Sequence, residues 1–90
     1  MKKVAIFGSK FWPGCESAKE VLSKNNVNYI CLDITEGMLY LKMFLKYRDN
    51  RPEFDDIRKK GRVGVPCIVV NDGEKIIFDL TEAVLEELRQ

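Results

Sequence analysis

The stretch KVAIFGSKFWPGC (residues 3–15) decides the fold, because it leads from an apolar strand into the start of a helix. Residues 3–7 are apolar and β-prone, and Gly8-Ser9 ends what reads as a buried strand. Pro13-Gly14 then marks a turn. From Cys15 to Lys24 the apolar residues recur at helical spacing, which predicts an amphipathic helix.

Two further elements are predicted after this helix. Residues 27–33 form a second strand, and a strand, a helix and a strand within about 30 residues make a βαβ unit, which is almost always right-handed. Thr35 is a suitable N-cap for a helix over about 36–48. That helix is unusually apolar, so we expect it to pack between the sheet and a neighbouring helix. Exposed aromatic residues on it would instead indicate a dimer face.

The second half of the chain predicts a short helix followed by a hairpin. The short helix is expected over about residues 53–60. Two strands, Cys67–Val70 and Lys75–Phe78, are joined by the sequence NDGE at 71–74, which is typical of a tight hairpin turn. These two strands are therefore expected to be antiparallel, whereas the first two are parallel.

The last element is a C-terminal helix. Asp79, with Glu82 three residues later, is expected to cap it in the manner of a capping box. The resulting order β-α-β-α-β-β-α predicts an α/β fold, a four-stranded mixed sheet flanked by helices. The length of 90 residues fits a single domain over 1–90.

Composition narrows the function classes. The chain is 46% hydrophobic and 32% charged with a net charge of +1, which argues against disorder and against attraction to nucleic acid or membranes. The apolar run near the N-terminus is too short for a secretory signal, so we expect a cytoplasmic location. There are three cysteines and no histidine. That set makes a poor zinc site, and no disulfide framework is expected in a reducing compartment.

Two places could carry chemistry. Cys15 is predicted at a helix N-terminus, where unpaired backbone amides and the helix dipole stabilise a thiolate, the nucleophile of disulfide exchange. It also lies on the apolar face of its helix, so it could equally be a core residue. Val65-Pro66 opens the third strand. A proline there is either an ordinary strand start or a cis-proline that exposes the preceding backbone to a peptide.

In combination these elements resemble the glutaredoxin family of the thioredoxin-like superfamily. The family frame is Lys-x-x-C-P-Y-C, a helix, T-V-P and a glycine-rich hairpin. This chain offers SKFWPGC at 9–15, GVP at 64–66 and NDG at 71–73. The resemblance covers nearly the whole chain. The longer segment at about 36–62, with RDNRPEFD at 48–55, looks like a bacterial glutaredoxin-related branch.

The resemblance implies roles for individual residues. In glutaredoxins the first cysteine of C-P-x-C attacks and the second resolves or is dispensable. Here Trp12 occupies the attacking position and Cys15 matches the second, so the motif is W-P-G-C. The positions that would hold glutathione or a substrate are Lys10, Pro13, Val65, Pro66 and, at its other end, Asp79. Glutaredoxins that hold iron–sulfur clusters bind them through the first active-site cysteine. That cysteine is absent here, so no metal is expected.

Three interpretations of Trp12 are open. The protein has lost the ordinary reaction and serves as a binding or regulatory module, for which exposed aromatic residues suit partner contact. Alternatively, Cys15 acts with Cys67, which requires Cα atoms no more than about 7 Å apart. In the third interpretation, the natural residue at position 12 is selenocysteine and its codon was misread as tryptophan. The selenocysteine codon, UGA, differs from the tryptophan codon only in its last base.

The sequence therefore predicts a divergent glutaredoxin-like thiol–disulfide oxidoreductase, acting on glutathione mixed disulfides or protein disulfides. Cys15 is its thiol, Cys67 a possible second thiol, and glutathione its cosubstrate, with no bound cofactor. The alternative is a redox-inactive binding or regulatory module, which a buried Cys15 sulfur would favour. A third possibility is a structural domain without a working groove. The chain is expected to be a monomer or weak dimer.

Two remaining features have a plainer interpretation beside a functional one. Cys31 shares a face of its strand with Tyr29, and we interpret it as a packed or sheet-surface thiol. The basic cluster RKKGR at 58–62 ends the short helix, where cations are stabilised and solvated. The alternative for this cluster is that it faces the substrate groove and attracts a carboxylate of glutathione or of an acidic partner.

Overall fold

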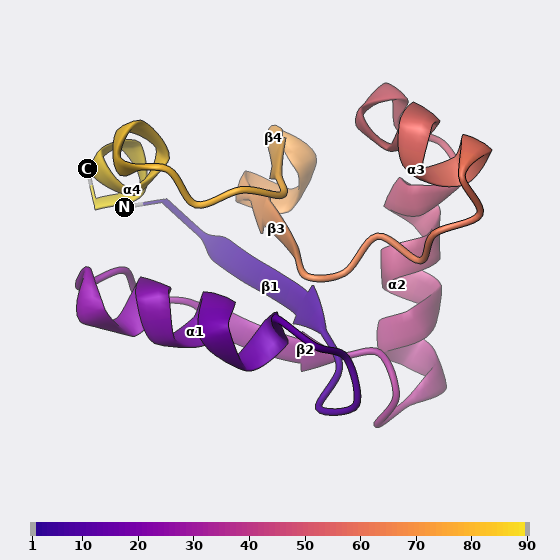
Figure 1. The fold of residues 1–90 in the computed structure, drawn as a ribbon, viewed down its shortest axis with the longest axis horizontal. Coiled ribbons are helices and arrows are strands. Elements are labelled where there is room, and N and C mark those ends of the chain that lie inside the picture. Colours follow the sequence, from indigo (N-terminus) through magenta and orange to yellow (C-terminus); the bar gives the residue numbers. More distant parts are fainter. Residues whose placement is uncertain (1, 90) are drawn as a thin grey trace.

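The computed structural model describes residues 2–89 and confirms the predicted α/β fold (Figure 1). Its four strands form one sheet in the order β2-β1-β3-β4, with β1 parallel to β2 and antiparallel to β3, and β3 antiparallel to β4. The elements are β1 (Val4–Gly8), α1 (Cys15–Lys24), β2 (Ile30–Asp33), α2 (Met38–Arg48), η1 (Pro52–Phe54), α3 (Asp55–Lys59), β3 (Cys67–Val70), η2 (Asn71–Gly73), β4 (Lys75–Ile77) and α4 (Glu82–Arg89).

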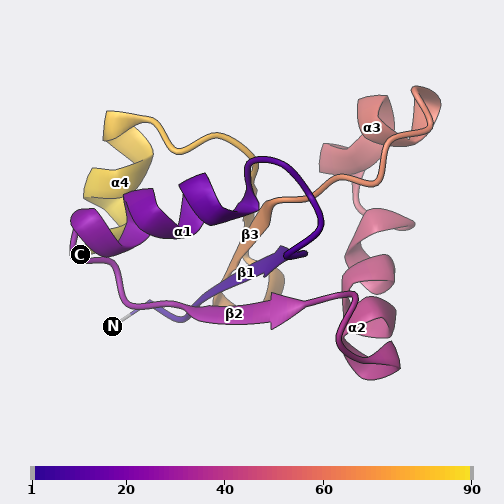
Figure 2. The ribbon, with the colours of Figure 1, turned by 60° about the horizontal axis from the view of Figure 1, so that its bottom comes forward.

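Each face of the sheet buries its own apolar cluster, because successive side chains of a strand point to opposite faces. Helices α1 and α4 lie together on one side of the sheet, and α2 and α3 lie at the other (Figures 1 and 2). The α1/α4 side buries aliphatic residues around Ile6, Leu22 and Ile68. The other side buries three aromatic rings in mutual contact, those of Phe7, Phe44 and Phe54, and extends to Phe78.

The hairpin turn is confirmed at the predicted place. Backbone angles in the left-handed region occur at three successive residues, with φ of 49° at Asn71, 58° at Asp72 and 116° at Gly73. Asparagine, aspartate and glycine tolerate this region better than other residues. The sequence NDG therefore folds into the connection that reverses the chain between β3 and β4.

Both predicted helix caps are wrong. Helix α2 starts after Gly37, an extended residue without a side-chain cap, because the Thr35 hydroxyl instead donates to the Asp33 carboxylate and lies 3.2 Å from the Ser9 hydroxyl. Helix α4 is capped by Thr81 in place of Asp79, since the Val84 amide donates to the Thr81 hydroxyl at 3.2 Å. In the first case, contacts with Asp33 and Ser9 occupy the Thr35 hydroxyl. In the second case, the capping residue lies two positions after the predicted one.

Strand β2 is shorter than the predicted 27–33. The amide of Val27 donates to the Leu22 carbonyl at 3.0 Å and so belongs to the C-terminus of α1. Ladder pairing with β1 begins only at Ile30, opposite Ala5. The predicted strand over residues 27–29 is therefore replaced by a connection, in which the Val27 amide and the Tyr29 hydroxyl contact α1.

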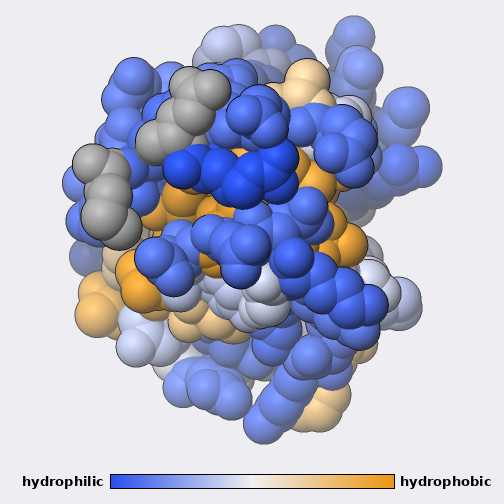
Figure 3. Space-filling model, turned by 90° about the vertical axis from the view of Figure 1, so that its left-hand side faces the viewer, coloured by the Kyte–Doolittle hydropathy of each residue, from blue (hydrophilic) through white to orange (hydrophobic). Residues whose placement is uncertain are grey.

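Helix α2 is less enclosed than predicted. Phe44 is its only buried residue within the described chain, whereas Met38 is 79% exposed and Leu39 and Met43 are also exposed. The opposite side of the molecule, which carries α1 and α4, is mostly hydrophilic, with some hydrophobic side chains showing between hydrophilic ones (Figures 1 and 3). Exposed apolar surface is thus concentrated on the α2 side. No helix within residues 2–89 is both long and apolar enough to cross a membrane.

Candidate functional site

The turn before α1 closes over the Cys15 thiol. A Cβ atom on Gly8 would lie only 2.9 Å from the Cys15 sulfur, so this glycine makes room for the side chain. The Ser9 amide donates to the same sulfur at 3.4 Å, and Cys15 is only 3% exposed. Trp12, three residues earlier, is 43% exposed. The tryptophan and not the cysteine therefore faces solvent at the start of α1.

The other two cysteines lie near this turn in different environments: Cys67 belongs to the same buried cluster as Cys15, and Cys31 lines a small cavity with Gly8, Ser9 and Cys15. All three are free thiols. Cys67 is fully buried in the aromatic cluster, and this burial raises the pKa of its thiol to about 12, with a smaller contribution from the Glu53 carboxylate. It is therefore protonated at neutral pH. Cys31 is exposed on the edge strand, as a sheet-surface thiol, and partial burial raises its pKa against the opposing effect of the Lys19 ammonium.

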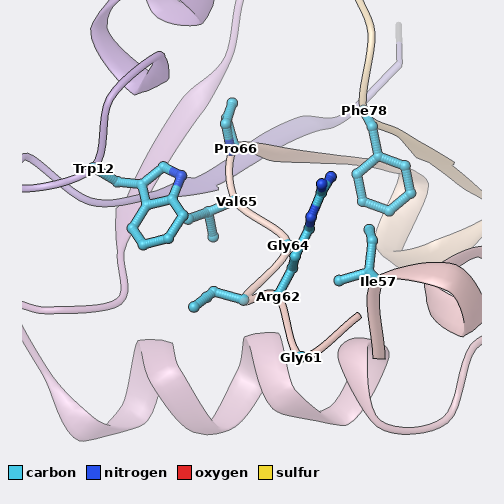
Figure 4. Close-up of a pocket in the computed structure, with 9 residues that line it drawn as sticks. Trp12, Ile57, Gly61, Arg62, Gly64, Val65, Pro66 and Phe78 are labelled. Carbon is cyan, nitrogen blue, oxygen red and sulfur yellow. The ribbon is translucent and has the colours of Figure 1, made fainter. Parts of the chain in front are cut away.

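A groove of about 540 Å³ lies beside the start of β3 (Figure 4). The peptide bond between Val65 and Pro66 is cis, as the resemblance implies. Trp12 stands on one side of the groove and Phe78 with Ile57 on the other, with the Val65-Pro66 backbone between them (Figure 4). The groove is lined by Trp12, Ile57, Gly61, Arg62, Val63, Gly64, Val65, Pro66 and Phe78.

The backbone of Val65 is available to a ligand. Within residues 2–89 neither its N–H nor its C=O makes a hydrogen bond to the protein. Buried backbone polar groups are nearly always paired in native proteins, so these two groups require water or a bound partner. They point to a ligand with its own extended backbone, which would pair as an added strand.

Packing under the groove requires glycine at position 64. Gly64 has a φ of +100°, and a Cβ atom there would lie 3.0 Å from Cε1 of Phe54. Phe54 is fully buried and contacts Phe78 edge to face at 4.9 Å between ring centroids. The RPEF sequence thus supplies the ring on which the floor of the groove rests.

Two arginines brace the wall of the groove. The Arg48 guanidinium donates to the carbonyl of Arg62 at 2.6 Å. Arg58 donates to the carbonyls of Arg48 and Arg51, and it forms an ion pair with Asp55. These bonds tie α2 and α3 to the chain that enters β3. Arg58, a member of the basic cluster, is therefore structural.

Arg62 behaves differently from the rest of the cluster. Its side chain lines the groove and points in the direction of Phe78 (Figure 4), and it makes no ion pair within the described residues. The groove-facing alternative for the basic cluster thus holds for Arg62. A cation here, among apolar side chains, is suited to a carboxylate.

Three residues that the resemblance assigned to substrate do not line this groove. The Lys10 ammonium lies 3.7 Å from a Glu36 carboxylate oxygen and 5.2 Å from the centroid of the Phe11 ring. Pro13 and Asp79 are exposed and are also absent from the lining. Sequence reasoning missed Ile57 and Phe78, because neither belongs to a motif. The apolar character of the groove appears only when α3 and β4 are brought together.

Comparison with known proteins agrees with this geometry. A family model for glutaredoxin matches residues 4–76, which include α1, the groove floor and the start of β4. This chain belongs to the glutaredoxin family. An uncharacterized protein from Haemophilus influenzae is 27% identical over 82 residues, covering 91% of this chain and 94% of that protein.

A solved structure supports the same fold for this glutaredoxin-family chain. The crystal structure of a mutant of a thioredoxin-like protein matches with a TM-score of 0.63 and 23% identity, covering 98% of this chain and 100% of the other. The thioredoxin-like architecture that the resemblance implied is therefore confirmed. Within residues 2–89, no group of three or more acidic, cysteine or histidine side chains is placed to hold a metal ion.

Proposed function

We propose that this glutaredoxin-family protein is a binding module that holds the extended backbone of a peptide, either glutathione or a protein segment, in the groove beside Val65. The unpaired N–H and C=O of Val65 in a groove walled by Trp12 carry this proposal. In the family resemblance Trp12 stands where the attacking cysteine would be. An indole ring can cover a ligand but cannot form a mixed disulfide with it.

Binding by strand addition follows from the chemistry of the groove. The ligand backbone would accept a hydrogen bond from the Val65 amide and donate one to the Val65 carbonyl. Each such bond contributes on the order of 1 kcal/mol net, and more where the unpaired group is otherwise buried. Apolar contact with Trp12, Pro66 and Phe78 would add to this, because each presents apolar surface to the groove.

Thiol–disulfide exchange through Cys15 is the second candidate function. The position of Cys15 favours it, because this thiol opens α1 and a backbone donor, the Ser9 amide, already contacts the sulfur that would react. In that reaction the Cys15 thiolate would attack one sulfur of oxidised glutathione. A sulfur–sulfur bond would form to Cys15, the original disulfide would break, and a glutathione thiolate would leave. The 3% exposure of Cys15 weighs against this second function, since attack requires access to the sulfur.

Two measurements separate the candidates. S-methylglutathione, which cannot exchange, is titrated into ¹⁵N-labelled protein. We expect the amide signals of Gly64 and Val65 to shift saturably. Reduced protein is then treated with oxidised glutathione and examined by intact mass, with Cys15→Ser and Cys31→Ser as matched controls. Shifts without an adduct on Cys15 support the module. An adduct that disappears only in Cys15→Ser would establish exchange, and the absence of any amide shift would refute the binding proposal.

A further inference from the structure

Charge is distributed unevenly along this chain. The segment 42–62 carries eight cations and four carboxylates, a net charge of +4, whereas the whole chain has a net charge of +1. The remaining residues therefore carry a net charge of −3. This segment comprises most of α2, all of α3 and the connection that leads to the groove.

The uncompensated cations fall in the same segment. Within residues 2–89, nine of the cationic side chains form ion pairs. Lys2 donates to the Glu87 carbonyl. The cations left without any ion pair are exposed and are Lys42, Lys46, Lys59, Lys60 and Arg62. A surface of one sign attracts ligands of the other sign.

Of these five cations, only Arg62 lines the groove. The Arg48 guanidinium holds the backbone of Arg62 by donating to the Arg62 carbonyl. Within residues 2–89 the Arg62 guanidinium has no carboxylate partner. The other lining side chains are apolar: Trp12, Ile57, Val63, Val65, Pro66 and Phe78. A ligand that satisfies the groove therefore has an extended backbone, an apolar side chain and a carboxylate near it.

We infer that the occupant of the groove is an acidic segment of a partner protein, in extended conformation, with an apolar residue flanked by glutamate or aspartate. This inference rests on the proposed binding function and specifies its ligand class. Charge complementarity selects such a segment over neutral or basic ones. Exposed apolar side chains outside the groove, Phe11 at 75% and Met38 among them, lie on the loop before α1 and at the start of α2. The loop before α1 is held to the end of β2 and the connection that follows it by hydrogen bonds from the Lys10 amide to Asp33 and between the Ser9 and Thr35 hydroxyls.

The test uses three blocked peptides that differ only in charge. Their sequences are acetyl-GELEG-amide, acetyl-GQLQG-amide and acetyl-GKLKG-amide, and S-methylglutathione is measured beside them. Dissociation constants are obtained by calorimetry and by the amide shifts of Gly64 and Val65. We expect the acidic peptide to bind about 5-fold more tightly than the neutral one, as for one charge-assisted contact of moderate exposure, and the basic peptide to bind least. The preference should shrink in 0.5 M salt, because exposed charges are then screened.

Substitutions assign the preference to one side chain. Arg62→Gln should remove most of the difference between the acidic and neutral peptides, and Arg62→Lys should keep part of it. Lys24→Gln, which removes one positive charge at the far end of α1, should leave the preference intact. Circular dichroism confirms that each variant is folded.

The outcomes separate this inference from the function on which it rests. If S-methylglutathione binds at Val65 and no peptide does, or if acidic and neutral peptides bind equally, the acidic-segment inference is wrong while the groove function stands. If an acidic preference survives Arg62→Gln, the assignment to Arg62 is overturned. If neither the peptides nor S-methylglutathione shift the Val65 amide, the binding function itself fails.

Discussion

The start of α1 and the start of β3 differ in what they offer to a ligand, although both border the same end of the sheet. At α1 the thiol of Cys15 is enclosed by Gly8 and Ser9, and an aromatic ring takes the exposed position. At β3 the backbone of Val65 is unpaired and lines a groove. On the proposed function, the part of the site that would pair with a ligand backbone is therefore open, while the Cys15 thiol is closed off.

The largest expected change comes from restoring a thiol at the exposed position. In a Cys31→Ser background, which removes the exposed thiol of β2, Trp12→Cys should convert a protein that oxidised glutathione leaves unmodified into one that is fully glutathionylated, because position 12 is 43% exposed and close to the helix N-terminus. Intact mass and peptide mapping follow the reaction. Trp12→Ser, which opens the same space without a thiol, is the control. Equal modification of the Cys31→Ser protein with and without Trp12→Cys would mean that the remaining native thiols already exchange, and the contrast between the two sites would disappear.

The floor of the groove can be disrupted without touching the thiol. Gly64→Ala should lower the free energy of unfolding by about 2–3 kcal/mol, since a left-handed backbone and a contact with the Phe54 ring both oppose a Cβ atom. Gly14→Ala is the matched control: its φ is +93°, but no atom lies within 4 Å of the added Cβ. It should cost about 1 kcal/mol. Chemical denaturation measures both, and equal losses would contradict the role of Phe54.

Because the Cys67 thiol is buried, we expect the free energy of unfolding to fall at alkaline pH. The pKa of Cys67 is about 12 in the folded protein against an ordinary 9.0, so between these values the unfolded state has lost the proton that the folded state keeps. This contribution is complete below about pH 9 and decreases as the pH rises toward 12. At pH 10.5 the loss should be about 2 kcal/mol. Urea denaturation of wild type and Cys67→Ala at pH 8 and 10.5 checks this. The same alkaline loss in both proteins would rule out Cys67 as its source.

The smallest effect concerns the wall of the groove. Arg48→Ala removes the donor to the Arg62 carbonyl and should reduce stability by about 1–2 kcal/mol, as for a hydrogen bond with a charged donor. It should also weaken binding of S-methylglutathione, because the connection to β3 loses its tie to α2. Arg89→Ala, which breaks an exposed pair on α4, should cost about 0.5 kcal/mol and leave binding unchanged. Comparable binding in both variants would show that the wall needs no brace.

Much of the fold could be predicted from local patterns. The boundaries of α1 and β3 were predicted correctly, because apolar periodicity and the PG and VP turns are strong over those stretches. The helix caps at Thr35 and Asp79 were predicted wrongly, since the Thr35 hydroxyl is engaged by Asp33 and Ser9 and since Thr81 accepts the amide hydrogen bond at the start of α4. The cytoplasmic location and the monomeric or weakly dimeric state stay predictions.

The sequence by itself determined the order of elements, because turn residues and hydrophobic periods act over a few residues, and its motifs indicated the family. It left open whether the bond before Pro66 is cis, which the structure decided. Only the tertiary structure decided what the site presents. The burial of Cys15 depends on the contact with Gly8, and the neutrality of Cys67 depends on the aromatic cluster around it. The groove itself needs Trp12, Arg62 and Phe78 from three distant segments. Exposure and electrostatics are properties of packed neighbours, and a linear pattern does not contain them.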